Sequence, residues 1–106
     1  MTEDFPSLTI QEIYKDVSDF KKRNSCFQSD PFVRLAFTTE ELGEVSRELL
    51  KGSISELNSK ALATEVFDVF WNLCGILKSQ EITPEDFAEA ARAKMTKNKK
   101  RKFPTH

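Results

Sequence analysis

The run from Val66 to Leu77 constrains the fold of this chain more than any other feature of its sequence. As a helix it is apolar on nearly every side, yet it contains Asp68 and Asn72. Such a helix is usually buried, often partly by a second subunit. No segment shows the alternation of apolar and polar residues that a half-buried strand requires. The run must therefore be covered by other helices.

Two helices are predicted before this run. The first spans residues 9–23, where apolar residues keep helical spacing and Thr9 with Glu12 has the spacing of a capping box. The second begins at Asp30-Pro31, which supplies an N-cap and a first helical residue. We expect Lys51-Gly52 to close it, followed by a polar loop or frayed turn.

The apolar run belongs to a third predicted helix over residues 57–79. Thr83-Pro84 is a strong start signal for a fourth helix, which we expect to end at about Lys99. The sequence thus predicts an all-α, four-helix bundle in a single domain over residues 1–106. A chain of this length builds only a thin core, so oligomerisation is expected to complete the bundle.

Charge is distributed unevenly along the chain. Of the sixteen Lys and Arg residues, seven lie in residues 92–102, where there is no acid. The remaining nine bases face all seventeen acids, which gives that part of the chain a charge near -8. A general nucleic-acid binder would have a basic face across the whole domain. We therefore describe an acidic body with a basic C-terminal tail, residues 92–106.

Few residues support thiol or histidine chemistry. Cys26 and Cys74 are isolated thiols, and His106 is the only histidine. A serine–histidine or cysteine–histidine nucleophile is therefore disfavoured, as is a His-ligated zinc or di-iron site. The chain has no long apolar run of the kind that spans a membrane and no signal-peptide pattern. We expect a soluble protein in a reducing, cytoplasmic setting.

The acids of the second and third helices share one spacing. Positions i, i+3 and i+7 lie on one face of a helix. Two sets have this spacing: Glu41, Glu44 and Glu48, and then Glu65, Asp68 and Asn72. A short loop forces the two helices to pack antiparallel, so the two faces can meet. The simpler interpretation is that the acids of the second helix form a solvated face.

Converging carboxylates would need a counter-charge. Two carboxylates ~4 Å apart repel by about 4 kcal/mol at an effective dielectric constant of about 20. A divalent cation removes this cost, and oxygen ligands without His or Cys favour Mg²⁺, with Mn²⁺ as a possible substitute. Mg²⁺ in such a site commonly takes phosphate oxygens as further ligands. The spacing therefore indicates phosphoryl chemistry.

Three segments carry a family resemblance. EELGE at 40–44 and EVFD at 65–68 resemble the EExxE and ExxD motifs of the MazG-like all-α nucleoside triphosphate pyrophosphohydrolases. The tail AKMTKNKKRKFP at 93–104 is similar to the closing segment of that superfamily, which includes dCTP pyrophosphatases and dimeric dUTPases. The resemblance implies Mg²⁺-dependent attack of an activated water on the α-phosphorus of an NTP or dNTP. The products would be a nucleoside monophosphate and pyrophosphate.

The resemblance also implies roles for individual residues. The positions that match the metal-binding acids are Glu41, Glu44, Glu65 and Asp68. Glu40 matches a position that in some members assists as a base or binds an extra ion, and the resemblance makes Glu40 and Glu41 the candidate catalytic acids. The phosphate-binding positions are Lys94, Asn98 and Arg101, whose i, i+4, i+7 spacing would place them on one helical face. Homodimers or homotetramers of this family have active sites near subunit interfaces.

The preferred base is less well specified. Asn72 lies one turn beyond Asp68 and could hydrogen-bond a base or ribose, with Trp71 beside it. Core packing is the alternative for both residues. Two other functions stay open for the whole chain: a non-catalytic helical interaction module, and a small nucleic-acid-binding protein that uses the basic tail.

Overall fold

The computed structural model describes residues 7–24 and 30–102, and this part of the chain is all-helical. Its elements are α1 (Ile10–Arg23), α2 (Pro31–Ile54), α3 (Ser59–Ser79) and α4 (Pro84–Lys100). The prediction of an all-α fold is confirmed, and the described residues include no strand. None of these helices has an apolar stretch long enough to cross a membrane.

The predicted start signals act as N-caps. The Asp30 carboxylate accepts the backbone N–H of Phe32 at 2.8 Å, directly before α2. Thr83 and Asp86 form a complete capping box at the start of α4, with each side chain accepting a backbone N–H of the other residue. At α1 the Thr9 hydroxyl accepts the N–H of Glu12 at 3.1 Å. Local side-chain chemistry therefore fixes where these helices begin.

The end of α2 differs from the prediction. The helix continues through Gly52 to Ile54, so the expected closure at Lys51-Gly52 is wrong. Gly52 keeps a negative φ, so it does not act as a left-handed helix terminator. A Cβ atom at this position would lie 2.6 Å from Cδ1 of Leu57. The glycine therefore serves the close packing of the α2–α3 loop.

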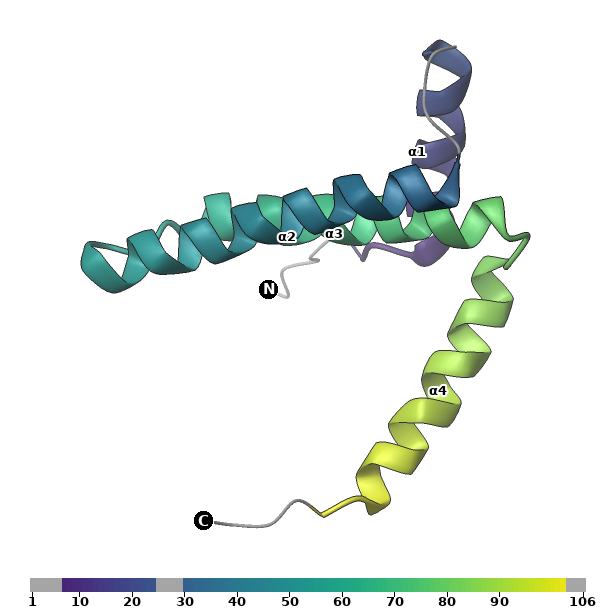
Figure 1. The fold of residues 1–106 in the computed structure, drawn as a ribbon. Helices are drawn as coiled ribbons and strands as arrows, with labels where there is room; N and C mark the ends of the chain where they lie inside the picture. Colours follow the sequence, from purple (N-terminus) through teal and green to yellow (C-terminus); the bar gives the residue numbers. More distant parts are fainter. Residues whose placement is uncertain (1–6, 25–29, 103–106) are drawn as a thin grey trace, which may run out of the picture.

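α2 and α3 pack as an antiparallel hairpin, and α1 packs against the C-terminal half of α3 (Figure 1). The buried core lies between α1 and α3. It consists of Ile13, Tyr14, Val17 and Cys74, which are the buried hydrophobic side chains of the described residues. The single chain therefore has a small core, as its length predicts.

The apolar run on α3 is covered on one side only. Cys74 and Asn72 are buried, but Val66 is 50% exposed and Leu73 is 40% exposed. A helix with this composition is normally covered all round. The single chain does not supply the cover that the sequence requires.

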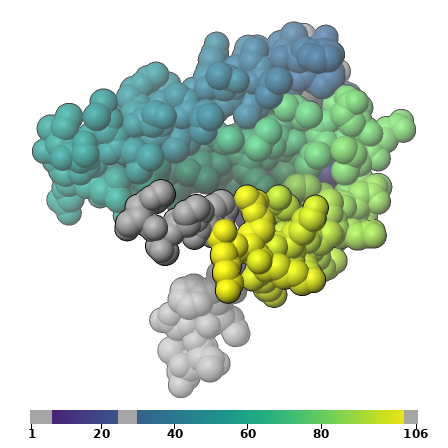
Figure 2. All heavy atoms as spheres, turned by 60° about the horizontal axis from the view of Figure 1, so that its bottom comes forward, coloured from purple at the N-terminus to yellow at the C-terminus, as the bar shows by residue number. Residues whose placement is uncertain are grey.

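α4 leaves the hairpin soon after it begins. Its first turns are held by the ring of Phe87, which meets Phe70 of α3 edge to face at 6.4 Å between centroids. From Arg92 onward every described residue of α4 is exposed. The helix runs away from α2 and α3 in Figure 1, and its yellow end lies nearest the viewer in Figure 2. The radius of gyration is 16.9 Å, against about 13 Å for a compact domain of this length.

Candidate metal centre

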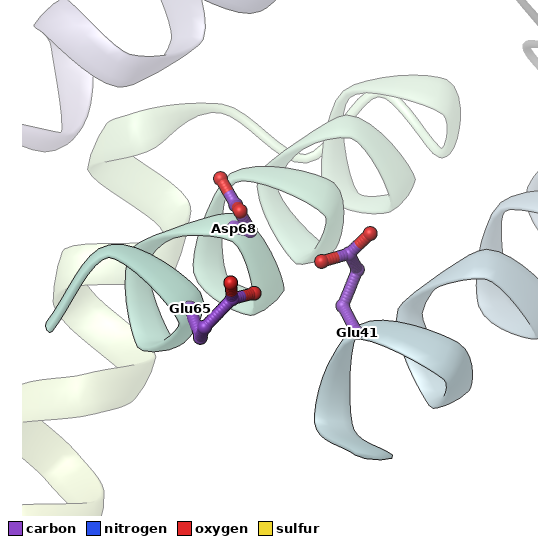
Figure 3. Close-up of side chains that lie close together, drawn as sticks. All are labelled: Glu41, Glu65 and Asp68. Carbon is purple, nitrogen blue, oxygen red and sulfur yellow. The ribbon is translucent and has the colours of Figure 1, made fainter. Parts of the chain in front are cut away.

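Three of the predicted metal ligands meet between α2 and α3. Glu41 extends from α2, and Glu65 and Asp68 extend from successive turns of α3, toward a shared space (Figure 3). Each residue offers a carboxylate oxygen within 4.8 Å of those of the other two. All three residues are half-buried. Antiparallel packing of two helices with ExxE and ExxD spacing accounts for this convergence.

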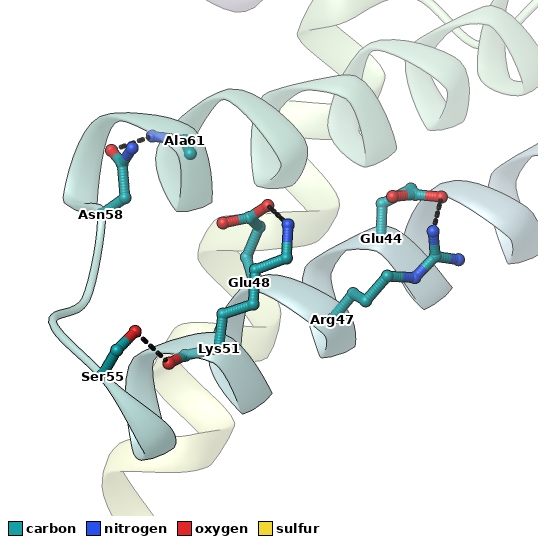
Figure 4. A network of polar contacts seen from close by, with 7 residues as sticks. All are labelled: Glu44, Arg47, Glu48, Lys51, Ser55, Asn58 and Ala61. Atoms are coloured by element: carbon teal, nitrogen blue, oxygen red, sulfur yellow. Dashed lines mark hydrogen bonds and ion pairs between the residues drawn. The ribbon is translucent and has the colours of Figure 1, made fainter.

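Glu44, the fourth predicted ligand, lies beside this group and pairs with another side chain. Its carboxylate accepts Nη1 of Arg47 at 2.9 Å, one turn along α2 (Figure 4). Glu48 pairs in the same way with Lys51 at 3.3 Å. Exposed pairs of this kind contribute little to stability. Glu44 can therefore exchange Arg47 for another partner at small cost.

Glu41 is the electrostatic centre of the group. Partial burial raises the pKa of its carboxyl, and the negative charges around it raise that pKa further. Asp68 and Glu65 contribute most of the repulsion, followed by Glu44 and then Glu40. Glu40, the other predicted catalytic acid, is exposed one position before Glu41. The site thus favours an added positive charge, either a proton or a cation.

The donor set fits a hard divalent cation. All the donors are carboxylate oxygens, which Mg²⁺, Mn²⁺ and Ca²⁺ prefer. Mg²⁺–oxygen bonds of about 2.1 Å place the oxygens around one ion at most about 4.2 Å apart. The observed spread, within 4.8 Å, is close to that distance. Glu41, Glu65 and Asp68 can therefore bind one such ion.

A buried polar pair adjoins the acids along the same helices. Nη1 of Arg34 donates to Oδ1 of Asn72 at 2.7 Å, and Nδ2 of Asn72 donates to the Asp68 carbonyl at 2.8 Å. Arg34 is only 7% exposed, and this burial lowers the pKa of its guanidinium. Asn72, predicted to contact a base or ribose, thus uses both ends of its amide within the chain.

Sequence reasoning did not identify Arg34, although the sequence contains a signal. It is the only charged residue in the run PFVRLAF, and it lies seven positions before Glu41 on the same face of α2. A charge on the packed side of a helix needs a polar partner. Asn72, in the apolar run of α3, is the corresponding polar residue. Arg34 lies seven positions before Glu41 and Asn72 lies seven positions after Glu65, so the two can be matched by their equal spacing from the acids.

Trp71 faces α1. Its Nε1 donates to Oδ2 of Asp16 at 2.9 Å, and its ring meets that of Phe20 edge to face at 5.4 Å between centroids. Trp71 therefore joins α3 to α1. Both residues predicted to contact a base or ribose have partners in the described part of the chain.

The predicted phosphate-binding residues lie away from the acids. Lys94 and Asn98 share a face of the exposed part of α4, which runs away from the hairpin (Figure 1). The helix ends at Lys100, and Arg101 is its C-cap with extended backbone angles. Residues 103–106 of the tail lie outside the described part of the chain.

Comparisons of the chain with family models, curated proteins and solved structures find no match.

Proposed function

We propose that this protein is a Mg²⁺-dependent hydrolase that converts a nucleoside triphosphate, NTP or dNTP, into a nucleoside monophosphate and pyrophosphate. The observation that supports this most is the convergence of Glu41, Glu65 and Asp68 from two helices. These acids belong to the two motifs, EELGE and EVFD, that resemble the MazG-like superfamily. The role of the protein would be to remove unwanted nucleoside triphosphates from the cytoplasmic nucleotide pool.

In this reaction Glu41, Glu65 and Asp68 would hold the cation, and Glu44 would join them if it left Arg47. A bound divalent cation lowers the pKa of water and offsets charge on the phosphate oxygens. The water oxygen bonds to the α-phosphorus, the bond from that phosphorus to the bridging oxygen breaks, and pyrophosphate leaves. A carboxylate takes the proton from the water, with Glu40 and Glu41 as the candidates.

The phosphates of the substrate require positive charge that the acid group lacks. Lys94, Asn98 and Arg101 can donate hydrogen bonds to phosphate oxygens, and Arg101 can do so in a bidentate manner. These residues stand away from the acids of their own chain. The proposal therefore includes self-association, as a homodimer or homotetramer, in which a partner chain completes the nucleotide site. To contact the base or ribose from α3, Asn72 and Trp71 would have to leave Arg34 and Asp16, their partners within the chain.

Two other functions have some support. A non-catalytic interaction module would explain the large exposed apolar surface of α2 and α3. A nucleic-acid-binding protein would explain the exposed bases of α4, and its affinity would fall steeply with salt. Only the hydrolase accounts for the convergence of three carboxylates, because neither alternative uses the site.

The test is pyrophosphate release from a panel of NTPs and dNTPs with standard and modified bases, in Mg²⁺ and in EDTA. We expect pyrophosphate and monophosphate only with the metal. Glu41→Gln should lose this activity, and Glu89→Gln, an exposed acid on α4, should keep it. Orthophosphate as the product would reject attack at the α-phosphorus. No turnover with any nucleotide would favour the interaction module.

A further inference from the structure

We propose that Arg34 is a positioning residue for the candidate metal centre. Its hydrogen bond to Asn72 sets how α2 lies against α3. This alignment brings Glu41 to Glu65 and Asp68. In this role Arg34 needs no contact with the cation or with a substrate. The inference rests on the cation binding that the proposed function requires, and it does not depend on which reaction follows.

The bond joins two buried side chains from different helices. Nη1 of Arg34 on α2 donates to Oδ1 of Asn72 on α3 at 2.7 Å, and both residues are buried. A guanidinium carries donors and no acceptor, and a buried charge without a hydrogen-bond partner is costly. Any other alignment of α2 on α3 must therefore supply Arg34 with a different acceptor.

Apolar packing specifies the alignment of α2 only weakly. The buried residues of this helix are Arg34 and Thr38, and both are polar. Each of the four leucines of α2 is more than half exposed. Apolar contacts at such exposed positions change little in area when a helix slides or turns, so they select no single alignment. A buried polar contact does select one, as a single buried Asn fixes the register of a coiled coil.

The spacing from this bond to the acids is the same on both helices. Glu41 follows Arg34 by seven residues on α2, and Glu65 precedes Asn72 by seven residues on α3. In antiparallel helices these two steps run in the same direction, and each covers about 10.5 Å of helix axis. Seven residues also return to nearly the same face of a helix. The bond that sets Arg34 opposite Asn72 therefore also sets Glu41 opposite the acids of α3.

The acids lie closer along the chain to this bond than to the loop that joins the two helices. The loop is flanked by Ser55 and Asn58, whose side chains cap the end of α2 and the start of α3 (Figure 4). These caps fix where each helix ends. Glu41 is fourteen residues from Ser55 but seven from Arg34. At the acids, the Arg34–Asn72 bond is therefore the closer constraint on the alignment.

The acids themselves oppose the alignment that brings them together. Three carboxylates with oxygens within 4.8 Å of one another repel when no cation is bound. A favourable contact elsewhere between α2 and α3 must offset this repulsion, and the Arg34–Asn72 bond is such a contact. The inference thus gives Asn72 a role at the metal centre that needs no contact with a base or ribose.

The first test compares Mn²⁺ binding with stability in the double variant Arg34→Leu with Asn72→Leu. This variant removes the buried charge together with its acceptor, so its urea midpoint should lie above that of Arg34→Leu alone. We expect it to bind Mn²⁺ at least tenfold more weakly than the wild type, measured by electron paramagnetic resonance of the free ion. Loss of a positive charge near acids would by itself strengthen cation binding, so weaker binding indicates a changed alignment.

Tyr14→Phe is the matched control. It removes a hydroxyl that donates to the Ile82 carbonyl at 2.9 Å, a hydrogen bond outside the contact between α2 and α3. This variant should lower the urea midpoint and leave Mn²⁺ affinity unchanged. Weaker Mn²⁺ binding by Tyr14→Phe as well would show that affinity follows stability, and it would overturn the positioning role.

Each contrary result has a distinct meaning. A wild-type protein that binds no Mn²⁺ overturns the candidate metal centre, and with it both this inference and the proposed function. Equal or tighter binding by the double variant overturns the positioning role and leaves the metal centre in place. Mn²⁺ binding that weakens as expected, without turnover of any nucleotide, overturns the proposed function alone.

A second test measures the alignment without metal. Spin labels on Ser46→Cys of α2 and Ala63→Cys of α3, both exposed positions, report the distance between the helices. The background is Cys26→Ser, and Cys74 is buried and escapes labelling. We expect one narrow distance distribution with Arg34 and Asn72 present, and a shifted or broader one in the double Leu variant. Identical distributions would contradict the inference.

Discussion

The seam is the contact between α2 and α3 that includes Arg34, Glu41, Glu65, Asp68 and Asn72. It differs from the second half of α4 in charge and in how its residues are held. In the seam, half-buried acids lie beside a buried Arg34–Asn72 pair, so packing of two helices fixes their positions. The second half of α4 carries bases that are all exposed. The comparison teaches that packing constrains the residues of the seam, whereas it places no such constraint on the exposed residues of α4.

The largest effect should follow a change to the acids of the seam. We expect Asp68→Asn to reduce metal-dependent hydrolysis by roughly a hundredfold or more, since it removes a ligand charge. Helix content should be unchanged, because the substitution also removes repulsion from Glu41. Single-turnover pyrophosphate release and circular dichroism measure the two quantities. Loss of the fold would mean that Asp68 is structural.

Arg34→Ala tests the buried Arg34–Asn72 pair of the seam. It leaves Oδ1 of the buried Asn72 without this donor, at a cost of about 2–3 kcal/mol in the free energy of unfolding. Urea denaturation measures it. The double variant Arg34→Leu with Asn72→Leu should be less destabilised than the sum of its single variants. Additive effects would argue that the pair is not coupled.

A smaller effect is expected at the start of α4. Thr83→Ala removes the hydroxyl that accepts the N–H of Asp86, which should destabilise the helix by about 1 kcal/mol. Because little of α4 is packed, hydrogen exchange should accelerate in α4 and stay unchanged in the hairpin. Equal acceleration in the hairpin would show that α4 supports the whole fold.

The pH dependence of stability separates Glu41 from the other acids. Its pKa is raised in the folded protein by burial and repulsion, so the folded state binds the proton more tightly than the unfolded state. Without metal, the stability associated with this group should therefore fall as pH rises through the range just above about 4.3, the ordinary Glu pKa. Glu41→Gln should remove that component. An identical pH profile for both proteins would contradict the proposed repulsion.

The smallest effect on stability is expected for Lys94→Ala. Its side chain is exposed on α4, so the free energy of unfolding should change by less than about 0.5 kcal/mol. Hydrolysis should nevertheless weaken, since a phosphate contact is lost. Urea denaturation beside steady-state kinetics gives both values. A large loss of stability would remove the contrast between α4 and the seam.

Features set within one helix could be predicted from the sequence. The caps at Thr9, Asp30 and Thr83, and the shared face of Glu65 and Asp68, depend only on helix geometry and neighbouring side chains. The meeting of Glu41 with the α3 acids required one further assumption, antiparallel packing across a short loop.

Features that depend on contacts between segments could not be predicted in the same way. Gly52 resembles a helix terminator in sequence, but the side chain of Leu57 determines its role. Glu44 has ligand spacing, but Arg47 competes for its carboxylate. The direction of α4 after Phe87 depends on a few contacts, which no periodicity in the sequence records.

The central claim is that Glu41, Glu65 and Asp68 bind a divalent cation. Thermal unfolding of the wild-type protein and of Glu41→Gln across a Mg²⁺ titration tests it most directly. A ligand that binds only the folded state at a hundred times its Kd stabilises it by about 2.7 kcal/mol. The account predicts a rising Tm for the wild type and a flat one for Glu41→Gln. Equal shifts in both proteins, or no shift in the wild type, would contradict it.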